Sequence, residues 1–382
     1  MTLQTISKIL TRDFILGFFA QFTFTIAYQI LIPTLPIYLS RLGSKETDIG
    51  ILIGIFGVSS LVFRPFVGRA LLKVPEKNFM ITGALLFALT SFAYLFAPPF
   101  WPFLIVRVLQ GVGLAFFYTA SFTLFANISP EIHRGQSLSY FYLAQNISLA
   151  LAPSLGMGLI NHFSFILLFL VCLSASLCSL FITNKLGKTQ VIQSEDSSIK
   201  SGLFLDRKAL PPSVISFFIF FIWGGLATFF PLYAISNGVT NPGLFFTAMA
   251  IMLISGRALG GKILDLYSRE RIILYFLATY AIAMGILAFS KNLPMFILVG
   301  MIWGTGSALC VPAVLAYTLD SVGSSRGPAM GTFTALSDLG LCLGPVVMGI
   351  IIRLTSYPIM FLCLAFIGVI NLIYFHFFVR KK

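Results

Sequence analysis

The sequence predicts an all-α polytopic membrane protein, on the evidence of its composition and of the spacing of its apolar stretches. Of its 382 residues, 58% are hydrophobic and only 10% are charged, which lies outside the range of soluble globular proteins. Apolar stretches of about 20 residues, the length of helix that crosses the hydrocarbon core of a bilayer, recur along the chain. Because the backbone must satisfy its own hydrogen bonds in hydrocarbon, we expect these stretches to be helices.

Twelve such stretches can be placed along the chain. In the first half they cover residues 14–39, 48–70, 79–97, 101–126, 135–160 and 163–183. In the second half they cover residues 211–235, 243–264, 272–290, 294–318, 327–353 and 357–379. The first stretch follows a polar segment with no small-residue cleavage site, so we expect an uncleaved helix rather than a signal peptide.

The longest polar stretch, residues 184–210, separates the two sets of six. It predicts an N-terminal six-helix bundle over 1–183, a cytoplasmic linker over 184–210 and a C-terminal six-helix bundle over 211–382. Lys and Arg are retained in cytoplasmic loops. With the N-terminus inside, the external loops hold only Arg41, Lys45, Lys291 and Arg353. The net charge of +13 therefore reflects topology rather than nucleic-acid binding, and we expect an inner-membrane protein with both termini in the cytoplasm.

The two halves also repeat each other. Arg64-Pro-Phe-Val-Gly68 matches Arg257-Ala-Leu-Gly-Gly261 at a separation of 261 − 68 = 193 residues, and Pro153 matches Pro345 at 345 − 153 = 192. A constant separation predicts two bundles of the same orientation, related by an axis along the membrane normal, with a cavity where they meet.

Three motifs carry a resemblance to a known family. The loop Gly261-Lys-Ile-Leu-Asp265-Leu-Tyr-Ser-Arg269 contains the Gly, Asp and basic residues of a cytoplasmic loop motif, whereas the first-half copy has Leu72 in place of the acid. Arg107-Val-Leu-Gln110-Gly111 is similar to a buried-arginine motif of the fourth helix. Ala152-Pro153-Ser-Leu-Gly156 is similar to an antiporter motif whose full form has Gly before Pro, as in Gly344-Pro345.

On these motifs the whole chain resembles the major facilitator superfamily, and within it the twelve-helix drug:H⁺ antiporters. The resemblance implies a secondary transporter that exports a small amphiphilic drug or metabolite in exchange for protons, by alternating access. It also implies that Arg107 acts in proton transfer or holds an anionic group, and that Pro153, Gly156 and Pro345 form the antiporter motif.

Asp338 is the first candidate for proton coupling. It lies eleven positions into the eleventh stretch, roughly 16 Å from the cytoplasmic boundary at 1.5 Å per residue. A carboxylate at that depth is costly unless it is paired or protonated, so its charge should respond to its surroundings. The alternative is an Asp that stays neutral and only hydrogen-bonds neighbouring helices. For Arg107, which stays charged, the alternative is snorkelling to the external headgroups.

Polar and aromatic residues in the expected cavity-lining helices are candidate substrate contacts. They are Tyr28, Gln29, Gln145, Asn146, Trp223 and Tyr317. For Trp223 and Tyr317, simple packing is the alternative and is slightly favoured.

Residues at the cytoplasmic ends of the second and eighth helices are candidates for a gate whose contacts differ between the transporter's two states. They are Arg64, Gly68, Arg257, Gly261, Asp265 and Arg269. An ordinary positive-inside anchor is the alternative for the arginines. Prolines 33, 36, 153, 312 and 345 are expected to interrupt the hydrogen-bond ladders of their helices, and glycines 111, 113, 304 and 306 are expected to let helices approach closely.

The sequence shows no phosphate-binding loop and no metal-ligand spacing, so we expect no ATP, no cofactor, no metal and no enzymatic activity. The expected partners are a small-molecule substrate, protons and the lipid bilayer, and a monomer is expected. A metabolite or sugar importer, a facilitator without proton coupling, and a lipid flippase or sensor of the same fold remain alternatives.

Overall fold

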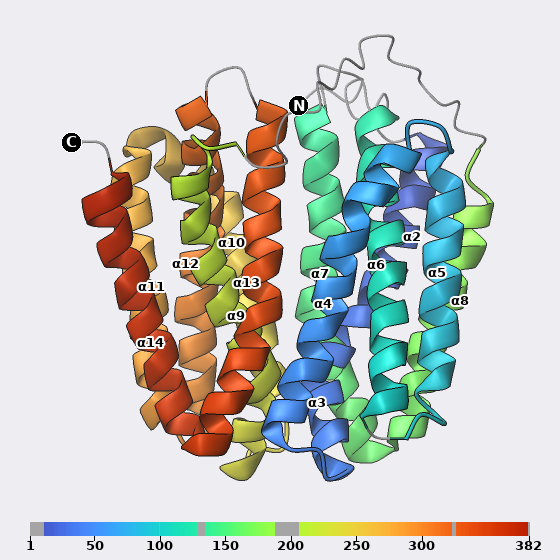
Figure 1. Cartoon of the computed structure of the whole chain (residues 1–382), viewed down its shortest axis with the longest axis horizontal. Coiled ribbons are helices and arrows are strands. Elements are labelled where there is room, and N and C mark those ends of the chain that lie inside the picture. The colour runs from blue at the N-terminus through green and yellow to red at the C-terminus, as the bar shows by residue number, and fades with distance from the viewer. Residues whose placement is uncertain (1–10, 99, 129–133, 188–205, 323–325, 381–382) are drawn as a thin grey trace. The chain divides into compact units, whose positions relative to one another are not determined.

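The computed structural model describes residues 11–98, 100–128, 134–187, 206–322 and 326–380; for 134–141, 259–266 and 326–328 it describes the helical backbone only. Every predicted stretch contains a helix, which confirms the all-α prediction (Figure 1). The helices of the first half are α2 (Arg12–Gln29), α3 (Leu31–Arg41), α4 (Glu46–Ala70), α5 (Glu76–Ala93), α6 (Trp101–Asn127), α7 (Arg134–His162) and α8 (Phe165–Asn184).

The second half has the same order of elements. Its helices are α9 (Leu210–Ser236), α10 (Gly243–Leu266), α11 (Arg269–Phe289), α12 (Leu293–Val322), α13 (Arg326–Leu354) and α14 (Tyr357–Tyr374), which continues into the π-helix η2 (Phe375–Val379). Within the described residues, ten helical segments are long and apolar enough to cross a membrane, and Gly243–Ala258 is a shorter apolar helix. The remaining helix, α5, opens with the polar residues Glu76, Lys77 and Asn78.

One of the predicted prolines coincides with a break in a helix. The first predicted stretch is broken at Ile30, where α2 ends at Gln29 and α3 begins. Pro33 explains this position, because a proline ring clashes with the carbonyl four residues earlier, here that of Gln29. Pro36, Pro153, Pro312 and Pro345 lie inside continuous helices, where each proline lacks the N–H of one backbone hydrogen bond without ending the helix.

Helix pairing repeats between the two halves. In the first half α2 packs on α7 and α8, and α5 packs on α6 and α8. In the second half α9 packs on α13 and α14, and α11 packs on α12 and α14. Matching pairs of helices thus build both halves, as the internal sequence repeat requires.

Close helix contact depends on glycine at several of these pairs. A Cβ on Gly83 of α5 would lie 2.6 Å from the backbone nitrogen of Phe117 and 2.7 Å from the carbonyl oxygen of Gly113 on α6. In the second half, a Cβ on Gly304 of α12 would lie 3.0 Å from the Cβ of Met252 on α10. The expected close approach at Gly113 and Gly304 is therefore confirmed.

By internal contacts the chain divides into two compact units. The first unit comprises Met1–Ile32 and Val58–Ser197, and the second comprises Pro33–Gly57 and Ser198–Lys382. Within the second unit Gly54 lies against α13, where a Cβ would be 2.6 Å from the carbonyl oxygen of Cys342. The bundle boundaries expected from the sequence remain a prediction.

Candidate functional site

Three polar side chains from three helices meet in the first unit. The hydroxyl of Tyr118 on α6 donates a hydrogen bond of 3.2 Å to Oε1 of Gln145 on α7. The guanidinium carbon of Arg64 on α4 lies 5.5 Å from the centroid of the Tyr118 ring, within range of a cation–π interaction. We call Arg64, Tyr118 and Gln145 the first-unit polar cluster.

The cluster occupies inward faces of its helices. At about 100° per residue, Tyr118 points about 180° away from the exposed Leu109 on α6. On α4, Arg64 lies about 160° from the two most exposed large apolar side chains, Val62 and Phe66, and about 100° from the exposed Phe63. Ionisable side chains in membrane helices face the bundle interior or a wet cavity, and these positions fit that rule.

The predicted contacts on α2 lie near this cluster. Tyr28 is close enough to Tyr118 for the two to interact electrostatically. The side-chain amide of Gln29 donates a 3.2 Å hydrogen bond to the Tyr28 hydroxyl. Asn146, next to Gln145 on α7, is half-buried. The structure therefore brings Tyr28 and Gln145 toward Tyr118, which lies against Arg64. The sequence had assigned Arg64 to a gate.

Arg107 lies apart from these residues, between α5 and α6. It is 4% exposed, and its Nη1 donates to Oε1 of Gln110 at 2.7 Å and to the Tyr94 hydroxyl at 3.4 Å. Tyr94 also donates to Gln110 Oε1, at 2.5 Å. The guanidinium therefore points into the bundle rather than snorkelling outward. Gln110 could have been recognised from its i, i+3 spacing to Arg107, whereas Tyr94 has no sequence signal.

Trp223 on α9 belongs to an aromatic group in the second unit. Its ring stacks on Trp303 of α12, with centroids 6.0 Å apart, and lies 6.1 Å from Phe246 of α10. Behind it, Trp303 is 2% and Tyr280 1% exposed, with their ring centroids 4.6 Å apart. Trp223 is the half-buried member of this group. Sequence reasoning missed Trp303 and Tyr280, because apolar surroundings make them look like ordinary packing.

Tyr317 lies away from the other predicted contacts. Its hydroxyl donates a 2.9 Å hydrogen bond to the backbone carbonyl of Val379, and its ring packs 6.0 Å from Phe375. It therefore ties the end of α12 to η2, and we do not retain it among the substrate contacts.

Asp338 lies in the middle of α13, twelve residues after Arg326 and sixteen before Leu354. Its side chain is half-buried and interacts with other groups of the protein. Among the acidic residues in the described helices, it alone lies more than three turns from both helix ends. This position keeps it the leading candidate for a titrating group.

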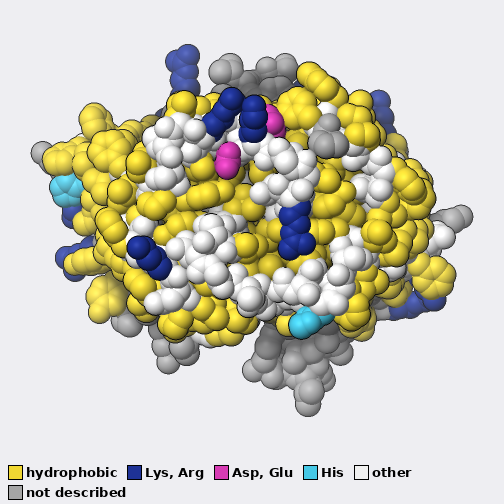
Figure 2. Space-filling view, turned by 90° about the horizontal axis from the view of Figure 1, so that it is seen from below, with side chains coloured by type: hydrophobic (Ala, Val, Ile, Leu, Met, Phe, Trp, Pro, Cys, Tyr) yellow, Lys and Arg dark blue, Asp and Glu magenta, His cyan; other side chains and the backbone are white. Residues whose placement is uncertain are grey.

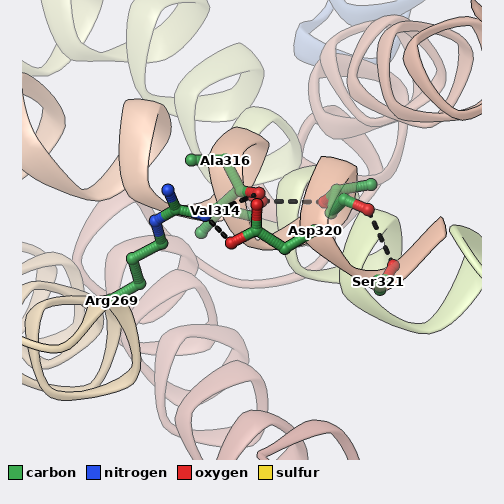
Figure 3. A network of polar contacts seen from close by, with 6 residues as sticks. Arg269, Val314, Ala316, Asp320 and Ser321 are labelled. Carbon is green, nitrogen blue, oxygen red and sulfur yellow. Dashed lines mark hydrogen bonds and ion pairs between the residues drawn. The ribbon is translucent and has the colours of Figure 1, made fainter. Parts of the chain in front are cut away.

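The predicted gate residues do not form one cluster among the described side chains. Arg269, at the start of α11, forms an ion pair with Asp320 near the end of α12, and its Nη1 donates to the carbonyl of Ala316 at 3.3 Å (Figure 3). Arg257 and Gly68 are exposed. Gly261 and Asp265 lie in the part of α10, residues 259–266, whose side chains are outside the described part of the structure. Asp320 is the residue that sequence reasoning missed here.

The residues of the antiporter-like motif are interior. Pro153 and Gly156 on α7 and Pro345 on α13 are buried. Gly344 packs against α9, where a Cβ would lie 3.1 Å from the backbone nitrogen of Gly225. At the matching position of the first half, Ala152 is fully buried, so this methyl group is accommodated on α7.

Each unit offers groups that can bind and orient a ligand. The first unit offers hydroxyl, amide and guanidinium groups, and the second offers an aromatic face and a carboxylate. Viewed from the end at which α3 leads into α4, the surface is largely hydrophobic with scattered charged side chains (Figure 2).

Comparison with known proteins agrees with this description. The chain is 26% identical over 366 residues to the staphylopine export protein of Staphylococcus aureus (strain Mu50 / ATCC 700699), covering 91% of each chain. It is 22% identical to the quinolone resistance protein NorA of Staphylococcus aureus (strain COL), covering 87% of this chain and 88% of NorA.

Solved transporter structures share the fold. The nucleoside transporter NupG superposes with a TM-score of 0.79 at 15% identity, covering 97% of this chain and 100% of that chain. The human organic anion transporter MFSD10 superposes with a TM-score of 0.71 at 16% identity, covering 95% of this chain and 98% of that chain. The sequence model of the family described as Major Facilitator Superfamily matches residues 17–273 and 239–382 of this chain. The chain is therefore a multi-pass membrane transporter that belongs to the Major Facilitator Superfamily.

Proposed function

We propose that this transporter exports a small amphiphilic molecule across the inner membrane in exchange for protons, with both termini in the cytoplasm and the monomer as the working unit. Two relatives that align with most of the chain are named as an export protein and a resistance protein, which supports the outward direction. The aromatic and amide groups described above suit an amphiphilic ligand.

The observation that carries the proton coupling is the position of Asp338. A carboxylate in the middle of a membrane helix is favoured as a charge only when it is solvated or paired. Alternating access exposes such a group first to one side and then to the other, so its proton can be exchanged for substrate in each cycle. We assign Asp338 as the proton carrier and Arg107 as a positioning residue that stabilises α5 against α6.

Reconstituted protein with a pH-sensitive dye inside the vesicles tests this assignment. We expect substrate addition to drive proton flux in the wild type, and Asp338→Asn to abolish that flux, because the amide cannot release a proton. Asp338→Glu is the matched control, since it keeps a titratable carboxyl group and should retain part of the coupling. Unchanged proton flux in Asp338→Asn would refute the assignment.

A further inference from the structure

The two membrane-embedded arginines of the first unit differ in what they can reach. Arg107 is enclosed, with its guanidinium directed at Gln110 and Tyr94. Arg64 is only half-buried, although it lies six residues, or roughly 9 Å, before the end of α4 at Ala70. Arg64 is therefore the arginine whose position suits contact with a ligand.

Anchoring to lipid headgroups explains Arg64 poorly. Arg69 already occupies the last turn of α4 and is exposed, which is the usual place for such an anchor. Arg64 instead lies against the aromatic face of Tyr118, on the side of α4 opposite Val62 and Phe66.

The neighbours of Arg64 suit an anion in particular. Tyr118 donates its hydroxyl proton to Oε1 of Gln145, so the carbonyl end of that amide faces Tyr118. The other end of the amide carries two N–H donors. Tyr118, Gln145 and Tyr28 supply hydroxyl and amide groups without negative charge, and a guanidinium pairs with a carboxylate through two parallel hydrogen bonds.

The internal repeat shows that the first half has a neutral residue at the position of the proposed proton carrier. The position equivalent to Asp338 in the first half is Asn146, at 338 − 146 = 192 residues. The first half thus has a neutral amide, next to Gln145, where the second half has an acid. An anionic ligand at the first-unit cluster would therefore meet a guanidinium and amides, with no carboxylate at that repeat position to repel it.

We propose that Arg64, Tyr118 and Gln145 form an anion subsite that binds the carboxylate of the transported molecule. The inference rests on the proposed function and narrows it to substrates that carry a carboxylate beside an apolar or aromatic body. Arg64 would thereby be a substrate-binding residue and not only a gate residue.

A matched pair of fluorescent probes tests this subsite, namely a quinolone with a free carboxylate and the methyl ester of the same quinolone. Binding is measured by fluorescence anisotropy on the full chain in lipid nanodiscs. We expect wild-type protein to prefer the acid, and Arg64→Gln to weaken acid binding by roughly tenfold or more, because a hydrogen bond to a charged group is lost. Ester binding should change less than twofold.

Three further variants sharpen the result. Arg64→Lys keeps the charge but not the two-pronged geometry, so it should bind the acid with intermediate affinity. Gln145→Glu places a carboxylate in the subsite and should weaken acid binding without weakening ester binding, which keeps the test valid if Arg64→Gln fails to fold. Arg12→Gln removes an exposed cation from the start of α2 and should change neither acid binding nor ester binding.

Several outcomes would overturn the proposal: equal wild-type affinity for acid and ester, no binding of either probe, or equal weakening of both by Arg64→Gln. Export itself is assessed separately, by proton-driven transport of a panel of neutral and cationic dyes in proteoliposomes. If the dyes are transported but the acid is not bound more tightly than the ester, the anion-subsite proposal is wrong and the proposed export function stands. If the acid is bound more tightly than the ester but no dye is transported, the anion-subsite proposal stands and the proposed export function is wrong.

Discussion

Arg107 shows how a single residue keeps a permanent charge inside a membrane bundle. Its described hydrogen-bond partners, Gln110 and Tyr94, are neutral, and Gln110 Oε1 accepts from both of the others. Phe103 and Phe169 pack on the Tyr94 ring at 4.8 Å and 5.2 Å between centroids. Gln110 Oε1 is therefore the acceptor that Arg107 and Tyr94 share, and it lies within an aromatic environment.

Removing that acceptor should destabilise the protein. Gln110→Leu leaves the buried guanidinium and hydroxyl without this acceptor, at an expected cost of about 1.5–3 kcal/mol in the free energy of unfolding. Gln110→Glu keeps the acceptor and adds a compensating charge, so it should be at least as stable as wild type. Thermal unfolding in detergent, followed by intrinsic fluorescence, measures the stability of both variants. Equal unfolding midpoints for wild type and Gln110→Leu would contradict the role of Gln110 as the shared acceptor.

At the scale of elements, the halves repeat a contact but change its chemistry. Where α5 begins, Glu76 accepts a 2.6 Å hydrogen bond from Nδ2 of Asn127 at the end of α6. The equivalent residues, at 269 − 76 = 193 and 320 − 127 = 193, are Arg269 and Asp320, which form an ion pair. Both contacts join the start of the third predicted membrane stretch of a half, α5 or α11, to the end of the fourth, α6 or α12.

The next residue along makes a second repeated contact. Lys77 donates to the carbonyls of Asn184, the last residue of α8, and of Leu186, two residues further on, each at 2.7 Å. Its equivalent, Glu270, lies 3.7 Å from the guanidinium Nε of Arg380 after η2. The repeat therefore preserves which helix ends are joined, while the signs of the charges differ between halves.

Burial predicts which version contributes more to stability. Glu76 is 5% exposed, whereas the side chains of Arg269 and Asp320 are 43% and 63% exposed. Asn127→Ala should therefore lower the free energy of unfolding by about 1–3 kcal/mol, because it removes a donor from a buried carboxylate. Asp320→Ala should cost less than about 1 kcal/mol, as exposed ion pairs do.

Chemical denaturation of the two variants in the same detergent provides the comparison. Added salt should diminish the effect of Asp320→Ala and leave that of Asn127→Ala nearly unchanged, since salt screens exposed charges. If Asp320→Ala lowers the free energy of unfolding more than Asn127→Ala does, burial does not determine which of the two contacts contributes more to stability.

For the whole molecule, the orientation in the membrane depends on where the basic residues fall. Cytoplasmic loops retain Lys and Arg, and the contacts of Lys77, Arg269 and Arg380 all lie at helix ends that the charge distribution assigns to the cytoplasm. Lys291, between α11 and α12, is assigned to the opposite side.

Cysteine labelling in intact cells tests this orientation. In a variant whose five native cysteines are replaced, Lys291→Cys should react with a membrane-impermeant maleimide added outside. Lys185→Cys, after α8, should react only after the membrane is permeabilised. Labelling of Lys185→Cys from outside would invert the predicted topology.

The sequence by itself determined the membrane class, the twelve helical stretches and the internal repeat. Hydropathy and helix length suffice for these, because the bilayer forces each apolar stretch to satisfy its own backbone. The break at Ile30 could also be placed from Pro33, since the steric effect of proline is local.

The tertiary structure decided which side chains meet. Arg64 joined Tyr118 and Gln145 rather than only a gate, Tyr317 turned to η2, and Trp223 stacked on Trp303. Each of these contacts joins residues far apart in the chain, and the rotation of every helix about its axis sets them. Hydropathy constrains that rotation weakly in a membrane protein, because the lipid-facing and the packed faces of a helix are both apolar.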